Sequence, residues 1–362
     1  MDALDAINAL LITDPVNIRY LTGFVGAAPE EREAYCLLAQ NNLFLFTNAL
    51  YIEQAKNLKS QIPNLKSKKL QVIEISREDP LSKKLQILTA ELNIKTLGFE
   101  EINLSYAEYR KLIGELPNVK LVGTQNRIEA RRQIKRDNEV AVIRKAAQIT
   151  DACFGFILGK LKPGVTESEI AWEIESFCRR NGATSAFSPI AAFGKNSSMP
   201  HYGGENNAKL TNNQIVLLDF GARYDGYCSD MTRMVFVGKP NNEWKTAYAA
   251  LLEAQQKALD LLAGGERSGA KLDEAARQIL TKHNLPLYPH SLGHGVGLAI
   301  HESPRLSYKK DIALKSGMAI TIEPGVYIEG QFGIRIEDLV YIGDNGMEIL
   351  SQSPKTLTII AS

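Results

Sequence analysis

Asp219-Phe-Gly-Ala-Arg-Tyr-Asp-Gly-Tyr-Cys-Ser-Asp230 decides how the second half of this chain folds. An apolar run at residues 215–218 leads into Asp219, and a second strand-like run at 227–237 carries Asp230. Asp225-Gly226 between the two runs is a strong signal for a two-residue hairpin turn. With that turn, Asp219 and Asp230 become diagonal neighbours on facing strands, and diagonal neighbours share a face of the sheet. The stretch therefore predicts two carboxylates that point the same way.

A second pair of strand-like runs, at residues 318–327 and 333–342, carries Glu323 and Glu337. The turn-prone Glu329-Gly-Gln331 joins them, so two more carboxylates are expected to meet across strands. A single acidic residue in a strand is usually solvated. Four carboxylates and a neutral imidazole in one pocket, however, could not all keep their charge states unless divalent cations lay between them. The candidate imidazole is His294, whose glycine-rich surroundings let the backbone approach a ligand closely. The sequence thus predicts a two-metal site formed by Asp219, Asp230, His294, Glu323 and Glu337.

These residues resemble the ligand motifs of the pita-bread metallopeptidases, the family of prolidase, aminopeptidase P and methionine aminopeptidase. The motif matches cover roughly residues 127–355 and occur in the family's order: 219–233, Gly293-His-Gly295, Thr321-Ile-Glu-Pro-Gly325 and Arg335-Ile-Glu-Asp338. Residues 194–202 and 297–302 match the segments that supply the family's accessory histidines, here His201 and His301. Asn17-Ile-Arg-Tyr-Leu-Thr-Gly-Phe24 extends the resemblance to the N-terminal domain of the prolidase and aminopeptidase P branch.

Strand-like and helix-like segments alternate in the first part of the chain and predict an α/β domain. The expected strands are 9–13, 35–38, 43–46, 70–75 and 96–99, and the expected helices are 15–20, 80–92 and 105–115. Residues 117–130 have few periodic signals and are interpreted as a junction. Apolar residues at helical spacing predict long helices at 132–158 and 167–180 that back the metal-bearing sheet.

The family resemblance implies that these strands and helices form a fold of class α/β (α+β). A creatinase/prolidase-like α/β domain at residues 1–126 would be followed by a pita-bread catalytic domain at 127–362, with a curved, mainly antiparallel sheet backed by helices. Only Met1–Asn8 precede the first strand, where the family usually has a longer helix. We therefore expect that helix to be short or absent, which affects the substrate cleft more than the chemistry.

The resemblance also implies a role for each site residue. Asp230 and Glu337 would bridge two ions, Asp219 would bind one of them, and His294 and Glu323 would bind the other. Glu323 would also take a proton from the attacking water, and His301 would stabilise the tetrahedral intermediate.

Three further residues are expected to support substrate binding and the ligands. His201 would contact the substrate. Arg305 matches an arginine that some prolidases use to hold the carboxylate of a C-terminal proline. Arg335 lies two residues before Glu337, hence on the same strand face, where it can pair with the ligand carboxylates. The alternative for Arg335 is an ordinary surface arginine.

The function that the resemblance implies is hydrolysis of the bond between an N-terminal residue and proline, through a hydroxide that bridges two metal ions. The enzyme would be an Xaa-Pro dipeptidase or an Xaa-Pro aminopeptidase, acting on small peptides with proline at the second position and assembling as a homodimer. An oxygen-rich site suits Mn²⁺, with Co²⁺, Fe²⁺ or Zn²⁺ as substitutes. Two alternatives stay open: a methionine-aminopeptidase-like peptidase, although that branch generally lacks a large N-terminal domain, and an inactive pita-bread binding module, which should have lost ligands.

The composition excludes several other classes of protein. The 362 residues are 44% hydrophobic and 23% charged, with a net charge of +1, so neither nucleic acid nor a membrane is an expected partner. No apolar stretch approaches the roughly 18 residues of a membrane span, and Met1-Asp-Ala-Leu-Asp5 lacks the basic start of a signal peptide. A cytoplasmic location is the default expectation.

Cysteines and local basic patches carry little functional information. Lys66-Ser-Lys-Lys69 and Arg131-Arg132 are interpreted as solvated surface. The cysteines lack metal-ligand spacing and are expected to be reduced: Cys36, Cys153, Cys178 and Cys228.

Overall fold

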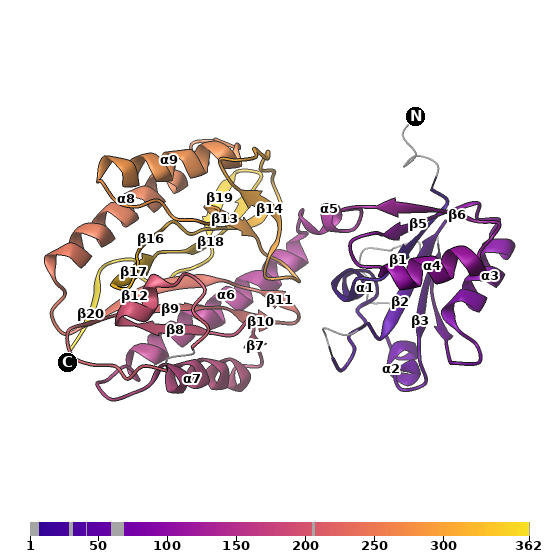
Figure 1. The fold of residues 1–362 in the computed structure, drawn as a ribbon, viewed down its shortest axis with the longest axis horizontal. Helices are drawn as coiled ribbons and strands as arrows, with labels where there is room; N and C mark the ends of the chain where they lie inside the picture. Colours follow the sequence, from indigo (N-terminus) through magenta and orange to yellow (C-terminus); the bar gives the residue numbers. More distant parts are fainter. Residues whose placement is uncertain (1–6, 29–31, 41, 59–68, 205–206, 362) are drawn as a thin grey trace. The chain divides into compact units, whose positions relative to one another are not determined.

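A computed structural model describes residues 7–28, 32–40, 42–58, 69–204 and 207–361. The chain divides into two compact units, Met1–Glu129 and Ala130–Ser362 (Figure 1). The domain limits expected at 126 and 127 stay a prediction. Met1–Ala6, from the short segment before the first strand, and Lys66–Lys68, from the first basic patch, lie outside the described residues.

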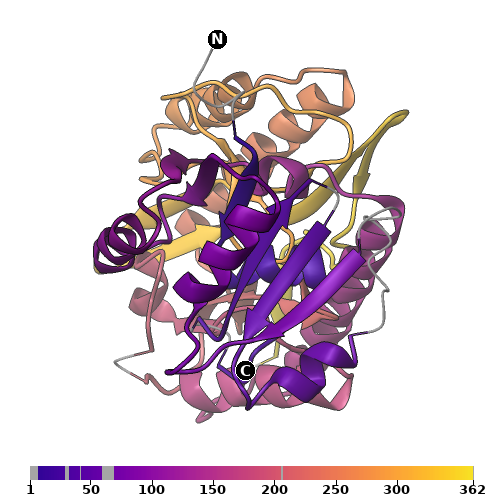
Figure 2. The ribbon, with the colours of Figure 1, turned by 90° about the vertical axis from the view of Figure 1, so that its right-hand side faces the viewer.

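The first unit is built on a six-stranded mixed sheet with the order β4-β3-β2-β1-β5-β6. Figure 2 shows its strands side by side, in indigo and purple. The strands are β1 Ala9–Ile12, β2 Ala34–Ala39, β3 Asn42–Thr47, β4 Lys69–Glu74, β5 Thr96–Glu100 and β6 Lys120–Thr124. The helices are α1 Pro15–Thr22, α2 Ile52–Lys56, α3 Leu81–Glu91 and α4 Tyr106–Glu115. The predicted alternation of strands and helices is confirmed.

Local sequence signals explain α1. The Asp14 side chain accepts hydrogen bonds from the backbone N–H groups of Val16 and Asn17, Pro15 occupies the first helical position, and Gly23 ends the helix with a φ of 77°. The segment 117–130, interpreted as a junction, contains β6, and the division between the two units falls at its end, between Glu129 and Ala130. That strand pairs in parallel with β5, and a partner far away in sequence leaves no local periodicity.

The second unit packs two pairs of helices around antiparallel strands. Figure 1 shows α8 and α9 along one side of the strands and α6 and α7 along the other. The helices are α5 Glu129–Arg132, which spans the division, α6 Asp137–Leu158, α7 Glu167–Arg180, η1 Gly194–Ser198, α8 Asn242–Ala263 and α9 Gly269–Lys282. The strands are β7 Thr184–Ser185, β8 Ile190–Phe193, β9 Gln214–Phe220, β10 Ala222–Tyr224, β11 Tyr227–Cys228, β12 Met231–Val237, β13 Gly293–Gly295, β14 Glu302–Leu306, β15 Ala319–Ile322, β16 Gly325–Ile328, β17 Phe332–Arg335, β18 Asp338–Gly343, β19 Gly346–Ile349 and β20 Thr358–Ile360.

Two larger sheets share these strands, with the orders β20-β12-β9-β8 and β14-β13-β15-β18-β19. One buried apolar cluster, which includes Leu251, Leu259 and Ile336, packs α8 and α9 against the strands. Another, which includes Phe154 and Val235, does the same for α6 and α7. Within the described ranges no helix has the length and apolar character needed to cross a bilayer.

The predicted helix 132–158 begins later than expected, at Asp137. The backbone N–H of Lys135 donates to Gly317 O (2.7 Å). It therefore bonds to a residue distant in sequence and not to a carbonyl of the preceding helical turn. Helix α7 has the predicted bounds, and its Thr166 and Glu169 form a capping box.

The first ligand hairpin has the predicted turn and register. Asp225 and Gly226 adopt positive φ values of 45° and 87°, as a type I′ turn requires. Thr232 lies opposite Asp219 in the ladder. The hairpin is interrupted at Gly221, where an added Cβ would lie 1.8 Å from Ser229 O. Only glycine permits the two strands to approach this closely.

The second hairpin differs from the prediction, because each expected long strand is broken in two. The breaks fall at Glu323-Pro324 and at Ile336-Glu337. Pro324 has no N–H for the ladder. The N–H of Glu323 donates to Leu292 O (2.7 Å), and that of Glu337 donates to Thr232 O (3.2 Å). Both glutamates therefore lie at the breaks, with their backbone N–H groups bonded to neighbouring segments.

Candidate metal centre

A cavity of about 370 Å³ in the second unit gathers every site residue that the sequence predicts. Its volume lies toward the small end of the ~300–1,000 Å³ typical of small-molecule sites. The lining residues are Phe187, Ser188, Ile190, His201, Tyr202, Asp219, Asp230, His290, Ser291, His294, His301, Arg305, Glu323, Arg335 and Glu337.

The acidic groups and the imidazole converge on one point of this cavity. Ligand atoms of Asp230, His294 and Glu337 all lie within 4.8 Å of one another, and all three residues are buried. His294 Nε2 lies 3.5 Å from Asp230 Oδ2 and 3.3 Å from Glu323 Oε1. These separations are suitable for groups that share cations, because ligand atoms around one ion sit two to three ångströms from it.

Asp219 lines the same cavity and pairs with Arg335. Its Oδ2 accepts a hydrogen bond from Arg335 Nη2. Its Oδ1 is buried and has no hydrogen-bond partner among the described residues. A buried carboxylate oxygen without a partner is costly, so this atom is a natural ligand for a cation in the cavity.

Burial and mutual repulsion disturb the charges of this cluster. Burial, followed by the neighbouring carboxylates, raises the pKa values of Asp230 and Glu337 well above their usual range. Burial also raises the pKa of Glu323 to about 7 and lowers that of His294. Such carboxylates stay ionised only if cations compensate them, and the oxygen-rich donor set with one neutral imidazole fits hard divalent ions.

Two threonines, neither of them predicted, donate hydrogen bonds to candidate ligands. Thr232 Oγ1 donates to Glu337 Oε2 (2.7 Å), and Thr321 Oγ1 donates to Glu323 Oε1 (3.1 Å). Each threonine lies two residues from a ligand in a strand-like stretch, and that spacing places it on the ligand's face. This period was the available signal.

The tautomer of His294 also suits metal binding. Its Nδ1 lies 3.1 Å from Gly295 O, so an N–H at this atom donates to the carbonyl. The lone pair is then on Nε2, which faces Asp230 and Glu323.

Arg335 pairs with a predicted ligand carboxylate, Asp219, and the surface alternative is wrong because the residue is only 3% exposed. Its Nη1 donates to Tyr327 OH (2.8 Å), and its Nε donates to Thr232 Oγ1 (3.0 Å). Tyr327 OH in turn lies 3.1 Å from His290 Nε2. His290 and Tyr327 were not predicted, although each lies four residues from a predicted ligand.

The remaining predicted residues lie at the exposed side of the cavity. The His301 ring packs edge-on against His294, with centroids 4.5 Å apart. Burial, followed by the effect of His294, lowers the pKa of His301 to about 4, so its imidazole is neutral near pH 7. His201 and Arg305 are exposed residues that line the same cavity.

The loop that carries His301 is tied down by Glu302. Its carboxylate accepts from Arg132 Nη2 and from Lys135 Nζ, both at 2.6 Å. The interpretation of Arg131-Arg132 as solvated surface is therefore wrong for Arg132, which is buried, whereas Arg131 is exposed. A buried partner carboxylate draws one of two adjacent arginines inward, which composition does not reveal.

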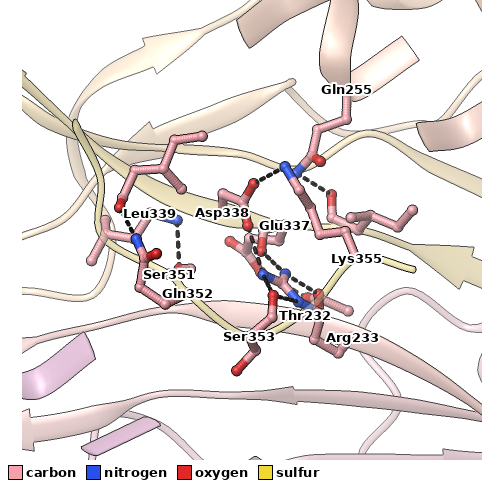
Figure 3. A network of polar contacts seen from close by, with 12 residues as sticks. Thr232, Arg233, Gln255, Glu337, Asp338, Leu339, Ser351, Gln352, Ser353 and Lys355 are labelled. Atoms are coloured by element: carbon pink, nitrogen blue, oxygen red, sulfur yellow. Dashed lines mark hydrogen bonds and ion pairs between the residues drawn. The ribbon is translucent and has the colours of Figure 1, made fainter. Parts of the chain in front are cut away.

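Behind the ligands, a buried polar network connects the two hairpins (Figure 3). Arg233 donates to Thr232 O (3.0 Å), to Glu337 O and to Asp338 Oδ1 (2.7 Å). Lys355 donates to the other oxygen of Asp338. This network joins the strand after Asp230 to the strand after Glu337.

Comparisons with known proteins agree with this geometry. The model of metallopeptidase family M24 matches residues 141–344, and that of the creatinase/prolidase N-terminal domain matches residues 1–134. An Xaa-Pro dipeptidase of Pyrococcus furiosus is 35% identical over 357 residues, 98% of this chain and 96% of that protein.

Solved structures of the same class superpose over nearly the whole chain. An Xaa-Pro dipeptidase from Bacillus anthracis is 35% identical with a TM-score of 0.87, covering 98% of this chain and 95% of the other. An X-Pro aminopeptidase from Thermotoga maritima is 32% identical with a TM-score of 0.86, covering 98% of each chain. The α/β (α+β) class, with the N-terminal domain followed by the pita-bread domain, is confirmed.

Proposed function

Because the chain belongs to metallopeptidase family M24, we propose that it is a dinuclear-metal exopeptidase that cleaves the bond between an N-terminal residue and proline. One observation carries the proposal: the cavity that gathers five metal-ligand candidates is also lined by His201, His301 and Arg305. The ligand cluster supports metal-assisted hydrolysis, and the two histidines and the arginine support the binding of a short peptide.

Five residues would hold two divalent ions: Asp219, Asp230, His294, Glu323 and Glu337. When bound, such ions polarise a carbonyl group and lower the pKa of water. By the family resemblance, Asp230 and Glu337 would be shared by the two ions, while Glu323 and His294, whose Oε1 and Nε2 lie 3.3 Å apart, would hold one of them.

Glu323 would move the proton that hydrolysis requires. Its carboxylate, with Oε1 3.3 Å from His294 Nε2, would take a proton from the attacking water and pass it on. The proton goes to the proline nitrogen, which must leave as a secondary amine. Thr321 Oγ1, which donates to Glu323 Oε1 (3.1 Å), keeps the carboxylate in place during both transfers.

The two accessory histidines would act on the substrate carbonyl and amide. His301 is a neutral imidazole, so it can donate one N–H to the oxygen on which charge develops. His201 lines the same cavity and would contact the peptide.

Arg305 would select dipeptides by pairing with the free carboxylate of a C-terminal proline. It lies opposite His294 in the β13–β14 ladder, so its side chain is carried beside the ligand cluster. A site for X-Pro bonds cannot use an amide donor at proline, because that nitrogen has no hydrogen. A carboxylate clamp supplies the missing polar contact.

The deciding experiment compares kcat/KM for Xaa-Pro, Xaa-Pro-Xaa and Met-Ala peptides with manganese-loaded protein. We expect the Xaa-Pro dipeptide to be preferred. Faster cleavage of Met-Ala would indicate methionine-aminopeptidase-like specificity. A protein that takes up no divalent ion and cleaves none of the three peptides would be a binding module.

We further propose Mn²⁺ as the native ion, a homodimer as the assembly and the cytoplasm as the location. These proposals rest on the donor set, on the family resemblance and on the composition, respectively. Metal analysis of protein purified without added ions and light scattering test the first two.

A further inference from the structure

The break in the second ligand hairpin leaves a carbonyl without its usual donor. Ile336 N donates to Pro324 O (3.4 Å), so these two residues form a hydrogen-bonded pair of the ladder. The reciprocal bond cannot form, because Pro324 has no N–H to give to Ile336 O. Ile336 is fully buried, so water is not at hand to replace it.

Gln255, in the middle of α8, supplies the missing donor. Its Nε2 donates to Ile336 O (3.3 Å) and to Ile322 O (3.1 Å). Figure 3 shows its side chain pointing toward the strand that carries Glu337 and Asp338. Gln255 is itself 0% exposed, and its Oε1 has no hydrogen-bond partner among the described residues. A buried glutamine whose carbonyl oxygen has no partner is unfavourable by itself. The two hydrogen bonds that its amide N–H groups donate are therefore the reason we infer for its place here.

The two carbonyls belong to the peptide groups that begin the ligand glutamates. Ile322 C=O shares a planar peptide group with the N–H of Glu323, and Ile336 C=O shares one with the N–H of Glu337. Those N–H groups donate to Leu292 O (2.7 Å) and to Thr232 O (3.2 Å). Each peptide plane is therefore held at both ends, by Gln255 at the oxygen and by a neighbouring strand at the nitrogen. This fixes the direction in which both glutamate side chains leave the backbone.

The other half of the domain repeats the arrangement. Thr150 lies thirteen residues after Asp137, the first residue of α6, and Gln255 lies thirteen residues after Asn242, the first residue of α8. Thr150 is 1% exposed, and its Oγ1 accepts from the N–H of Ala222 (3.0 Å), beside the interruption of the aspartate hairpin. Ser229 Oγ, 2.7 Å from Thr150 Oγ1, accepts from the same N–H (3.0 Å). Each long helix thus presents one buried polar side chain, at the same position, to the break in one ligand hairpin.

We propose that Gln255 is a positioning residue that holds Glu323 and Glu337 in the geometry that binds metal, as Thr150 does for the aspartate hairpin. The inference rests on the proposed function in one respect, that these glutamates hold the ions. Without the donors of Gln255, Ile336 O must find another partner, and the peptide planes that aim both carboxylates must turn.

The first test is the affinity of the full chain for Mn²⁺, measured by calorimetric titration of chelator-treated protein. Gln255→Met keeps the length of the side chain and removes both donors. We expect its affinity for Mn²⁺ to fall by about 10- to 100-fold, the usual effect of losing a group that orients metal ligands. Gln256→Met is the matched control, because Gln256 is exposed on the same helix and donates only to Asp260.

Steady-state kinetics at saturating Mn²⁺ distinguish a role of Gln255 in positioning the glutamates from a general disturbance of the fold. We expect Gln255→Met to lower kcat while KM for the dipeptide stays near the parental value, because His201 and Arg305 keep their places. A parental Mn²⁺ affinity in a folded Gln255→Met protein overturns the inference. If the parental protein itself takes up no Mn²⁺, the proposed function fails instead.

A double substitution tests the missing N–H directly. Pro324→Ala restores a donor opposite Ile336 O, so the losses of affinity in Pro324→Ala and Gln255→Met should be less than additive in the double variant. Additive losses contradict the inference. If Gln255→Met does not fold, the double variant Thr150→Val/Ser229→Ala, which removes both hydroxyl acceptors of the Ala222 N–H, carries the same titration in the other hairpin, and an unchanged affinity there also counts against the inference.

Discussion

Glu323 lies among groups that act on its carboxylate in opposite directions. Burial raises the pKa of Glu323 to about 7, while Arg335 and the hydroxyl of Thr321 oppose part of that shift. Its Oε1 also lies 3.3 Å from His294 Nε2, as expected for two groups that would hold one ion.

Glu323→Gln should leave the fold intact and lower kcat by at least ~100-fold, because the amide cannot accept the proton. Circular dichroism and a dipeptide assay in Mn²⁺ measure both quantities. Glu329→Gln, at the exposed tip of the same hairpin, is the control and should keep parental activity. A Glu323→Gln protein with near-parental turnover would refute the proton-transfer role.

Arg305→Ala should reduce kcat/KM for an Xaa-Pro dipeptide by about 10- to 100-fold, the range expected for a lost charge-assisted hydrogen bond. An Xaa-Pro-Xaa tripeptide carries its carboxylate one residue further on, so its cleavage should suffer less. The exposed Lys310→Ala, close by in the sequence, controls for a general loss of positive charge. Equal losses for the two substrates would exclude the carboxylate clamp.

The site depends on two β-hairpins, each of which is interrupted next to its candidate ligand residues. The first is interrupted at Gly221 and Asp230, and the second is interrupted at Glu323 and Glu337. At these interruptions the backbone bonds to neighbouring segments, as where Glu337 N–H donates to Thr232 O (3.2 Å). Acidic side chains from the two hairpins line one cavity.

Gly221→Ala should destabilise the protein and weaken Mn²⁺ binding, because the new Cβ would lie 1.8 Å from Ser229 O and the backbone beside Asp230 must move. Urea unfolding and a Mn²⁺ titration measure the two effects. Gly155→Ala is the matched control: it lies in α6 with nothing within 4 Å of its Cβ, and should stabilise by up to ~1 kcal/mol. Similar behaviour of the two variants would show that the close approach is not required.

For the second unit as a whole, the acidic cluster makes stability depend on pH and on metal. The folded-state pKa values of Asp230, Glu323 and Glu337 are raised by burial, so the folded state binds more protons than the unfolded state above about pH 4. Their contribution to the free energy of unfolding is complete below that pH. It is lost as pH rises through the folded-state values, which for Glu323 means about 7.

Chelator-treated protein should therefore lose stability between about pH 5.5 and about pH 8, and Mn²⁺ should raise its Tm more at the higher pH, because bound ions replace the protons. At a free ion concentration of 100 times Kd, the gain is about 2.7 kcal/mol. Thermal unfolding with and without Mn²⁺ at both pH values checks this. An equal or larger Mn²⁺ effect at low pH would contradict a metal-compensated carboxylate cluster.

Local sequence signals, such as turn and helix-capping residues, were enough to predict much of the structure. Asp225-Gly226 determines a turn, the turn determines which residues of β9 and β12 face each other, and α7 has the bounds that its capping residues indicate. The residues predicted as ligands line one cavity, and each sits in a short motif that is readable from the sequence.

What only the tertiary structure decided depends on partners that are distant in sequence. The break at Ile336-Glu337, the edge strand β6 and the burial of Arg132 all follow from contacts made across the fold. The roles of His290 and Gln255 are known only once strands and helices are packed, because Gln255 bonds to a carbonyl 81 residues away and such a partner leaves no periodic signal in the sequence. Local conformational preferences are properties of short segments, whereas the satisfaction of buried polar atoms is a property of the packed molecule.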